Sequence, residues 1–349
     1  MATDYSGDLS LAFAGHTQGR NLISLCLGQL SVLHHCFTLV GKVREVPATA
    51  LPSLPGYTKV LQLLSEFTIK SEFPVVRYFK TANYGVQHAR NFGASMAKSD
   101  WLTFCDSDDL LSSSYLETAN SFLVKNPRIG LVFSNFQIFK NGENGECSGQ
   151  EGEIQAQAEF LVSGARYTGG YYFEIPDLVR RLLRFQGFMA SGTSIRREAF
   201  LKIGGYNVEF RKILSEDFDF VLRALSRYEC GVSKSALVKI RKHGSNQSGN
   251  AVRQKIGECI VLDTFKKNEP FSTYYRYDIE QSIIHRLRAG IDLAYESCEF
   301  DYLKTMTLLL PIKGFTPKIL VKRWIAGLPQ NYRKRVYLMI EKAYEYKPK

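Results

Sequence analysis

"NYGVQHARNFGASMAKSDWLTFCDSDD", residues 83–109, joins a helical pattern to a short apolar strand that ends in acidic residues. The spacing predicts a helix over 85–98 and a strand over 100–106. The strand runs into three carboxylates within four positions, those of Asp106, Asp108 and Asp109. No lysine or arginine lies within several residues of them, and like charges this close resist ionisation unless something positive sits among them. A positive partner is therefore expected among them, and the rest of the chain should indicate what it is.

The alternation of strand and helix runs through the first half of the chain. Further strands are expected over 9–15, 36–43, 73–80 and 131–139, and further helices over 20–33 and 57–67. Strands that alternate with helices predict βαβ units in a doubly wound, mostly parallel α/β sheet. Ligands bind such sheets outside the carboxyl ends of the strands, which is where the acidic residues come.

The second half of the chain mixes loops with helices. Residues 140–153 are polar and glycine-rich, which predicts a turn or loop. A helix is expected over 196–207, closed by Gly204 or Gly205 as its C-cap. Another is expected over 215–228, where apolar residues recur at helical spacing.

The basic character of the chain belongs to its C-terminal end. The formal net charge is +11, and the residues from Lys313 onward carry ten basic side chains against two acidic ones, a net +8. The sheet pattern also stops at about residue 250, so we expect an α/β domain over 1–250 and a helical, basic C-terminal region over 251–349. No recognised nucleic-acid-binding motif accompanies the charge, so no nucleic-acid partner is expected.

Composition narrows the class of protein and its compartment. A hydrophobic content of 45% with 23% charged residues is typical of a globular protein and excludes a disordered or fibrous chain. The seven cysteines are odd in number and contain no C-x-x-C pair, which favours reduced thiols over a disulfide framework or a zinc site. The first residues show no secretory signal and no window approaches a membrane-spanning helix, so a cytoplasmic protein is expected.

The carboxylates at the strand end suit a hard divalent cation. Mg²⁺ usually takes one or two protein carboxylates together with substrate phosphates, so Asp106 and Asp108 predict a metal–diphosphate site. The alternative is that Asp108 or Asp109 only caps a helix that starts near Leu110. The residues alone leave both interpretations open.

Several segments together resemble family 2 glycosyltransferases of GT-A fold. The family's N-x-G-x-x-x-A-R-N-x-G segment, followed by D-x-D, is matched here by Asn83, Gly85, Ala89, Arg90, Asn91, Gly93, Asp106 and Asp108. Downstream, "GTSIRREAFLKIGGYN", "SEDFDFVLRA" and "KHGSNQS" resemble the family's acceptor-side segment, its E-D motif and its closing H-x-x-N-x-S loop. The resemblance covers roughly residues 8–250, and it implies a GT-A domain with a donor half over about 8–139 and an acceptor half over about 155–250.

The resemblance implies an inverting, metal-dependent glycosyltransferase that uses a nucleotide diphosphate sugar donor in polysaccharide or glycolipid synthesis. Asp217 would be the general base that takes the proton of the acceptor hydroxyl. The cofactor would be Mn²⁺ or Mg²⁺, held by Asp106, Asp108 and His243, and this cation would be the positive partner of the carboxylates at the strand end. The implied substrate-binding residues are Asn83, Gly85, Arg90, Asp106, Asp109 and Glu216.

Two of these roles have simpler explanations. Glu216 and Asp217 are also explained as acidic residues in the first turn of a helix, where the positive end of the helix dipole stabilises them. Arg90 either binds phosphate or pairs with a carboxylate.

The N-terminal strands depart from the family pattern. "AFAGHTQGRN" stands where the family has a P-x-Y-N-like loop, and "FTLVGKVRE" lacks the aspartate that usually contacts the nucleotide. His16 and Thr17 are the residues available to replace those contacts. Two other functions stay open: a sugar nucleotidyltransferase, and a carbohydrate-binding relative that has lost turnover.

The C-terminal stretch "FTPKILVKRWIAGLPQNYRKRVYLMIEKAYEYK" interleaves basic and apolar residues. The apolar ones are Ile319, Leu320, Trp324, Ile325, Tyr337, Leu338 and Ile340. Such a pattern fits a helix lying on an anionic membrane, which would place the protein on the inner face of the cell membrane near a saccharide or lipid-linked acceptor. The alternative is that these apolar residues pack into the protein. Pro317 and Pro329 are expected to prevent one long helix.

Overall fold

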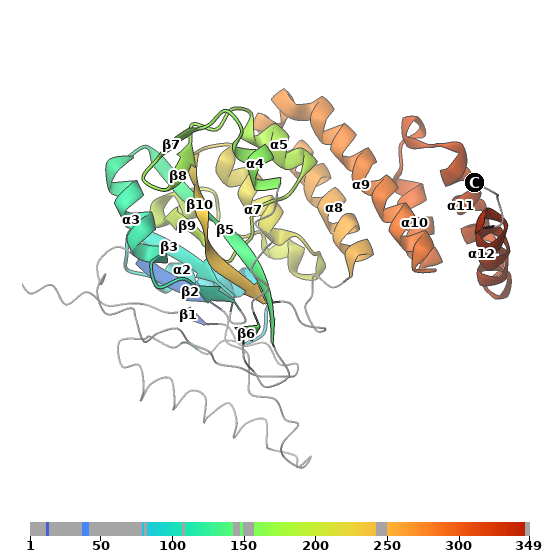
Figure 1. The fold of residues 1–349 in the computed structure, drawn as a ribbon, viewed down its shortest axis with the longest axis horizontal. Coiled ribbons are helices and arrows are strands. Elements are labelled where there is room, and N and C mark those ends of the chain that lie inside the picture. The colour runs from blue at the N-terminus through green and yellow to red at the C-terminus, as the bar shows by residue number, and fades with distance from the viewer. Residues whose placement is uncertain are drawn as a thin grey trace, which may run out of the picture. The chain divides into compact units, whose positions relative to one another are not determined.

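The computed structural model describes most of the chain beyond residue 82 (Figure 1). The described residues are 79, 82–106, 109–141, 147–148, 157–241 and 250–345, with the backbone alone of 12–13, 37–41, 140–141, 147–148, 157–158 and 341–345. The helices predicted over 20–33 and 57–67, and the residues Asp108 and His243, lie outside this part of the chain. The chain divides into two compact units, residues 1–212 with 216–244, and residues 213–215 with 245–349.

A central sheet organises the first unit (Figure 1). Its strand order is β1 (Ala12–Phe13), β2 (Phe37–Gly41), β3 (Trp101–Cys105), β9 (Thr193–Arg196), β5 (Ile129–Asn141), β10 (Glu229–Arg241), β8 (Tyr171–Phe173) and β7 (Arg166–Thr168), with β4 (Leu110–Leu111) on β10 and β6 (Cys147–Ser148) on β5. The helices of this unit are α2 (Val86–Met96), α3 (Tyr115–Lys125), α4 (Gln157–Val162), α5 (Leu178–Arg184), α6 (Arg197–Lys202), η2 (Val208–Lys212) and α7 (Glu216–Leu225). The predicted α/β architecture is confirmed.

Strand pairing is more mixed than the sequence predicted. β1, β2 and β3 run parallel, as do β5 and β10, which makes three parallel pairs. Six pairs among the described strands are antiparallel: β9 lies antiparallel between β3 and β5, β4 and β8 pair with β10, β6 pairs with β5, and β7 pairs with β8. The expectation of a mostly parallel sheet was therefore wrong in the second half of the unit. The two-residue connection between β7 and β8 permits only antiparallel pairing, and the antiparallel pairs of β9 join strands that are distant in sequence.

An aromatic cluster joins β3 to the helices that follow β9. The ring of Phe104 on β3 lies 5.5 Å from that of Phe200 on α6, 5.4 Å from that of Tyr206 and 6.1 Å from that of Phe220 on α7. The rings of Tyr206 and Phe220 stack at 4.3 Å. Each aromatic pair contributes about 0.5–1.5 kcal/mol beyond its buried area. This packing brings the first turn of α7 to the carboxyl end of β3.

The predicted helix over 196–207 is shorter than expected, because β9 takes its first residue and α6 ends at Lys202. Gly204 and Gly205 follow with positive φ of 80° and 65°, so the predicted glycine C-cap is confirmed. A Cβ on Gly205 would lie 2.5 Å from Asn91 Oδ1, so no other residue fits there without displacement. This turn therefore needs glycine for both its dihedral angles and its space.

The second unit is helical, as predicted. Its helices are α8 (Ala251–Asn268), η4 (Pro270–Tyr275), α9 (Arg276–Glu296), α10 (Phe300–Leu309), η5 (Ile312–Gly314), α11 (Pro317–Gly327) and α12 (Gln330–Glu345). Pro317 occupies the first turn of α11, and Pro329 precedes α12, so the expected interruption is confirmed. Within the described residues, no helix has the length and apolar composition needed to cross a membrane.

The core of the second unit contains part of the stretch predicted to face a membrane. Ile319 is 4% exposed and Ile325 is 0% exposed, and both belong to the hydrophobic core of α8–α12. Tyr337 and Ile340 pack against the same core. The membrane interpretation of these four side chains was wrong, because their sides of α11 and α12 pack against neighbouring helices.

Candidate active site

Arg90 is a positive partner of Asp106, the first acidic residue at the end of β3. It points from α2, is 5% exposed, and its Nη2 lies 2.8 Å from Asp106 Oδ1. Its Nη1 lies 2.9 Å from Glu216 Oε1 in the first turn of α7. The guanidinium carbon also sits 4.8 Å from the centre of the Tyr206 ring. Of the two roles the sequence left open for Arg90, the structure therefore shows carboxylate pairing.

Arg90 keeps its charge in this buried position. Burial acts to lower its pKa, but the carboxylates of Asp106 and Glu216 outweigh burial and hold the pKa above its ordinary value. A permanent cation thus links the end of β3 to the start of α7, which are 110 residues apart in sequence, from position 106 to position 216.

Asp109 and Asp106 form a turn after β3, in which the Asp109 N–H donates to the Asp106 carbonyl at 3.0 Å, and we call it the acidic turn. Asp109 Oδ2 accepts a hydrogen bond from Ser191 Oγ at 2.6 Å, and its Oδ1 accepts one from the Arg241 backbone N–H at 2.9 Å. The Ser191 oxygen in turn accepts from the Asp106 N–H at 2.9 Å. The helix that follows, α3, begins only at Tyr115, so Asp109 does not cap it and that alternative was wrong. The substrate-binding role of Asp109 stays a prediction.

Asp217 lies in the first turn of α7 with its Oδ1 held by two donors. Gln186 Nε2 and the Phe218 N–H each donate to that oxygen at 2.8 Å. Burial, and then the charge of Glu216, raise the pKa of Asp217 to about 7, while Arg90 and the two hydrogen bonds act to lower it. A carboxylate that titrates near neutral pH can accept a proton from a substrate hydroxyl and release it again.

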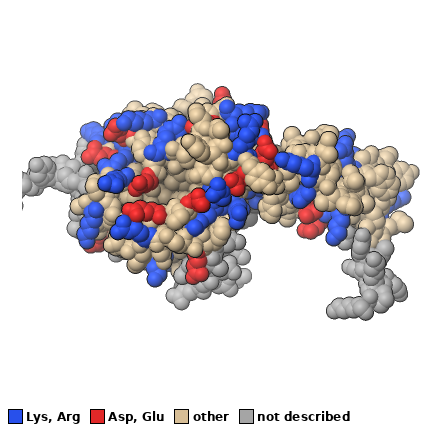
Figure 2. Space-filling view, turned by 90° about the horizontal axis from the view of Figure 1, so that it is seen from above, with Lys and Arg blue, Asp and Glu red and all other residues tan. Residues whose placement is uncertain are grey.

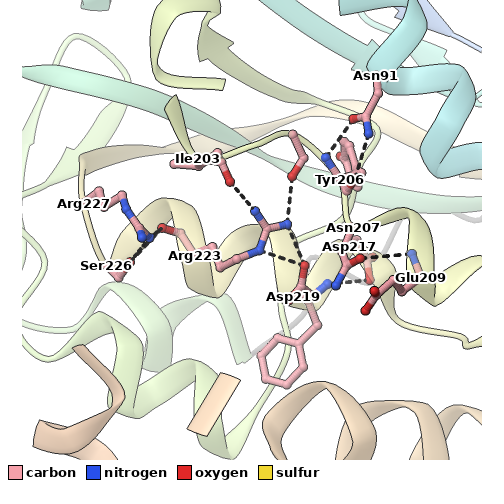
Figure 3. A network of polar contacts seen from close by, with 12 residues as sticks. Asn91, Ile203, Tyr206, Asn207, Glu209, Asp217, Asp219, Arg223, Ser226 and Arg227 are labelled. Atoms are coloured by element: carbon pink, nitrogen blue, oxygen red, sulfur yellow. Dashed lines mark hydrogen bonds and ion pairs between the residues drawn. The ribbon is translucent and has the colours of Figure 1, made fainter. Parts of the chain in front are cut away.

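Tyr206 lies close to these charged groups. It is 1% exposed, and its hydroxyl has no hydrogen-bond partner among the described residues. Burial raises its pKa, so it remains a neutral phenol. Its backbone is fixed by Asn91, whose side-chain amide donates to the Tyr206 carbonyl and accepts from the Tyr206 N–H, both at 2.8 Å (Figure 3).

α7 is tied to the turn after α6 by Arg223 (Figure 3). The Arg223 guanidinium donates to Asp219 Oδ2 through Nε at 2.9 Å and Nη2 at 2.6 Å. It also donates to the carbonyls of Ile203 and Gly205, both at 2.8 Å. Sequence reasoning missed this pair, although aspartate and arginine four residues apart on a predicted helix are a signal that could have found it.

Asn83 and Gly85 shape the start of α2. Asn83 Oδ1 accepts from the Gly85 N–H at 3.2 Å, and the Asn83 carbonyl accepts from Arg211 Nη2 at 2.7 Å. Gly85 has a φ of 97°, and a Cβ there would lie 2.9 Å from Arg211 Cγ. Their substrate-binding roles stay predictions.

The structure brings together four of the predicted residues: Arg90, Asp106, Glu216 and Asp217, with Asp109 joined to them through Ser191. Sequence reasoning missed Ser191 and Gln186, because neither belongs to a motif. Within the described ranges no cluster of three histidine, cysteine, aspartate or glutamate side chains forms a metal site. Asp106 fits one position of an oxygen-ligand set, since its carboxylate is 35% exposed at a strand end.

Comparisons with known proteins identify the family of this chain. The family model described as "Glycosyltransferase like family 2" matches residues 58–249, which is more than half of the chain and spans every residue of the site. The chain belongs to this glycosyltransferase family. An uncharacterized glycosyltransferase of Haemophilus influenzae is 29% identical over 153 residues, which are 44% of this chain and 45% of that protein. The match thus spans less than half the length of that relative.

Solved structures show the same fold for this family 2 member. Residues 1–349 of S. aureus TarS superpose with a TM-score of 0.52 at 13% identity, covering 97% of this chain and 93% of that one. The same TarS residues in complex with UDP-GlcNAc superpose with a TM-score of 0.52 at 12% identity. The longer TarS chain matches over 93% of this chain and 54% of its own length. At this level of identity the likeness concerns the fold alone, and it confirms the GT-A architecture.

Proposed function

We propose that this protein is an inverting glycosyltransferase that moves a sugar from a nucleotide diphosphate sugar to an acceptor hydroxyl. The observation that carries the proposal is Asp217, whose carboxylate has a pKa of about 7. Asp217 directly follows Glu216, which shares the cation of Arg90 with Asp106. The TarS structure bound to UDP-GlcNAc supports a UDP-sugar as the donor.

The reaction assigns a separate task to each part of the site. As the acceptor oxygen attacks the anomeric carbon and the bond to the diphosphate breaks, Asp217 takes the hydroxyl proton. The two hydrogen bonds to Oδ1 fix its carboxylate, and no hydrogen bond to Oδ2 exists among the described residues. We therefore assign Oδ2 as the oxygen that accepts the proton of the acceptor hydroxyl.

A divalent cation is the proposed cofactor. Asp106, Asp108 and His243 would hold Mn²⁺ or Mg²⁺, because oxygen and imidazole ligands suit these ions. When bound, the cation neutralises the negative charge of the departing diphosphate. Arg90 adds a second positive charge to the site, which neutralises the carboxylates of Asp106 and Glu216.

A panel of nucleotide sugars tests the proposal. The purified protein is incubated with UDP-GlcNAc and other UDP- and GDP-sugars in Mn²⁺, and release of the nucleoside diphosphate is measured with Asp217→Asn as the control. Slow release that the Asn variant lacks supports a glycosyltransferase. Binding without release by either protein would indicate a carbohydrate-binding relative without turnover. Pyrophosphate formation from a nucleoside triphosphate and a sugar phosphate would indicate a nucleotidyltransferase.

The acceptor is proposed to be a saccharide or lipid-linked chain at an anionic membrane surface, with the protein on the cytoplasmic side. On α11, Leu320 and Trp324 lie four residues apart and are 54% and 59% exposed. In η5, before α11, Ile312 is 92% exposed. Over the second unit, Figure 2 shows mostly uncharged surface interspersed with basic side chains and a few acidic ones. Apolar side chains beside lysine and arginine are typical of proteins that lie on membranes.

The basic charge of this surface is only partly neutralised by the protein. Lys313 pairs with Glu280 at 3.1 Å and Lys322 pairs with Asp292 at 2.7 Å. The side chains of Lys318, Lys334 and Arg335 have no ion pair among the described residues, and each would contribute about 1 kcal/mol near an anionic surface.

Sedimentation with anionic vesicles tests the membrane surface. Deleting the basic stretch from Lys313 onward would also remove the core residues Ile319 and Ile325, so point variants are needed. Ile312→Ser with Trp324→Ser should reduce pelleting with phosphatidylserine vesicles at low salt. Tyr277→Ser, at a tyrosine that is 71% exposed on α9, is the matched control. Equal pelleting of all three proteins would reject this surface as the anchor.

A further inference from the structure

Residues 185–192, between α5 and β9, form a segment that contacts both acidic parts of the candidate site. We call it the bridging segment. Phe188 is 3% exposed, and its ring stacks on that of Phe133 on β5 with a centroid distance of 3.9 Å and an interplanar angle of 6°. At the far end, the Gly192 carbonyl accepts a hydrogen bond from the Tyr115 hydroxyl at 2.8 Å. The segment is therefore fixed in the core at two points.

Gln186 is the contact of the bridging segment with α7. Its Nε2 donates to Asp217 Oδ1 at 2.8 Å, while its Oε1 is buried without a partner among the described residues. A buried amide oxygen left unpaired is unfavourable, so the side chain is held in this orientation by its bond to Asp217. The bond is charge-assisted when Asp217 is ionised, and it therefore favours the carboxylate form.

Ser191 is the contact of the bridging segment with the acidic turn. It is 5% exposed, donates to Asp109 Oδ2 at 2.6 Å and accepts from the Asp106 N–H at 2.9 Å. One hydroxyl thus joins the first and last residues of the turn over 106–109. Its removal would take away the bond that Asp109 Oδ2 accepts and the bond that the Asp106 N–H donates.

We propose that the bridging segment positions both acidic groups of the site, with Gln186 orienting the general base Asp217 and Ser191 fixing the turn that carries Asp106. The inference rests on the proposed glycosyltransferase function for its chemistry. Gln186 and Ser191 are positioning residues, because they touch the acidic side chains and backbone rather than the reacting atoms.

The two residues have different predicted effects, because they act on different groups. The titratable groups that face Asp217 are Glu216 on the same helix, Arg90 on α2 and Tyr206 in the turn after α6. None of them replaces the amide donor of Gln186. Loss of that donor removes a bond that favours ionised Asp217, so its pKa rises. A hydrogen bond to a charged group is strong enough to move a pKa by about one unit.

The test of Gln186 is the pH dependence of turnover in Gln186→Met, a variant of similar length without the amide. With the pKa of Asp217 at about 7 in the wild type, a rise of about one unit lowers turnover about fivefold at pH 7 and hardly at pH 9. Gln87→Met is the matched control. Gln87 is 2% exposed and donates to the Phe210 carbonyl at 3.0 Å, and its own oxygen is also unpartnered among the described residues.

A direct measurement keeps the inference independent of activity. ¹³C NMR of labelled aspartate carboxyls, assigned with Asp217→Asn, should show the titration of Asp217 moving to higher pH in Gln186→Met and not in Gln87→Met. Equal loss of turnover at every pH, with an unmoved titration, would overturn the role of Gln186.

The test of Ser191 is Mn²⁺ binding, followed by electron paramagnetic resonance in the presence of UDP. Residues that orient metal ligands typically change metal affinity 10–100-fold, so Ser191→Ala should weaken binding about tenfold or more. Its pH profile should match that of the wild type. Ser233→Ala, at a serine that is 2% exposed and whose hydroxyl donates to the Ser235 carbonyl at 2.7 Å, is the control and should bind Mn²⁺ normally.

The outcomes separate the inference from the proposed function. A wild type that neither turns over nor binds nucleotide sugars rejects the function, while the NMR titration of Asp217 still decides the role of Gln186. An active wild type in which Ser191→Ala keeps full Mn²⁺ affinity overturns the role of Ser191.

Discussion

Asp217→Asn should stabilise the protein at alkaline pH while it removes activity. The pKa of Asp217 is raised from 3.8 to about 7 by burial and by Glu216, so the folded state favours the protonated carboxyl. Between these two values the folded state binds more protons than the unfolded state. Stability is therefore fully present below about pH 3.8 and falls as the pH rises to about 7.

The size of this effect follows from the two pKa values. A shift from 3.8 to about 7 corresponds to about 4 kcal/mol at 1.36 kcal/mol per unit. The Asp217 side chain keeps some contact with solvent, which screens the cost, so about 2 kcal/mol is the expected difference. Asparagine keeps an oxygen for the Gln186 and Phe218 donors, so it removes the charge without removing either hydrogen bond.

Urea unfolding of the wild type and Asp217→Asn at pH 5, 6, 7 and 8.5 measures this difference. The free energy of unfolding of the variant should exceed that of the wild type by an amount that grows up to about pH 7 and then levels off. Asp219→Asn is the control on the same helix, and it should destabilise the protein at all these pH values because it breaks the buried pair with Arg223. A difference between Asp217→Asn and the wild type that stays constant with pH would refute the reasoning.

Three further predictions concern the reaction and the ion pairs. In a transfer assay, Asp217→Asn should lose about 10²-fold or more in turnover with nearly unchanged donor binding. The wild-type rate should rise with pH, with a midpoint near pH 7. Weaker donor binding at normal turnover would instead place Asp217 in the substrate pocket. EDTA should abolish transfer, and Mn²⁺ or Mg²⁺ should restore it. Asp108→Ala should be inactive but folded, as measured by circular dichroism. Full activity in chelator would contradict the metal site. Arg90→Met should lower the free energy of unfolding by about 3 kcal/mol, the lower end for removing one partner of a buried pair, because Asp106 is partly exposed; an unchanged urea midpoint would show that the ion pairs add nothing.

Local patterns were enough to place several elements and the first residues of the site. The helix α2 and the strand β3 follow from residue spacing within "NYGVQHARNFGASMAKSDWLTFCDSDD", and each needs only neighbours along the chain. The same holds for α7, whose buried Phe218, Val221 and Leu222 recur at helical spacing. Motif order also sufficed to single out Asp106 and Asp217.

Helical periodicity did not decide which face of α11 is buried. Ile319 and Leu320 are adjacent in a sequence that reads as one apolar–basic pattern, yet one is 4% exposed and the other 54%. The side that packs is set by α9, α10 and α12, whose positions the local sequence does not contain. For the same reason the insertion of β9 between β3 and β5, and with it the antiparallel pairing, was not visible in the alternation of strands and helices.

The sequence by itself determined the α/β class, the family resemblance and the acidic residues of the site, because those depend on residue type and short spacing. Tertiary structure alone decided how the acids are held. Ser191 reaches Asp109 across 82 residues, and Gln186 reaches Asp217 across 31. Tertiary structure also decided the pKa of Asp217, because burial and the charges of Glu216 and Arg90 act through space and arise only when α2, β3 and α7 meet.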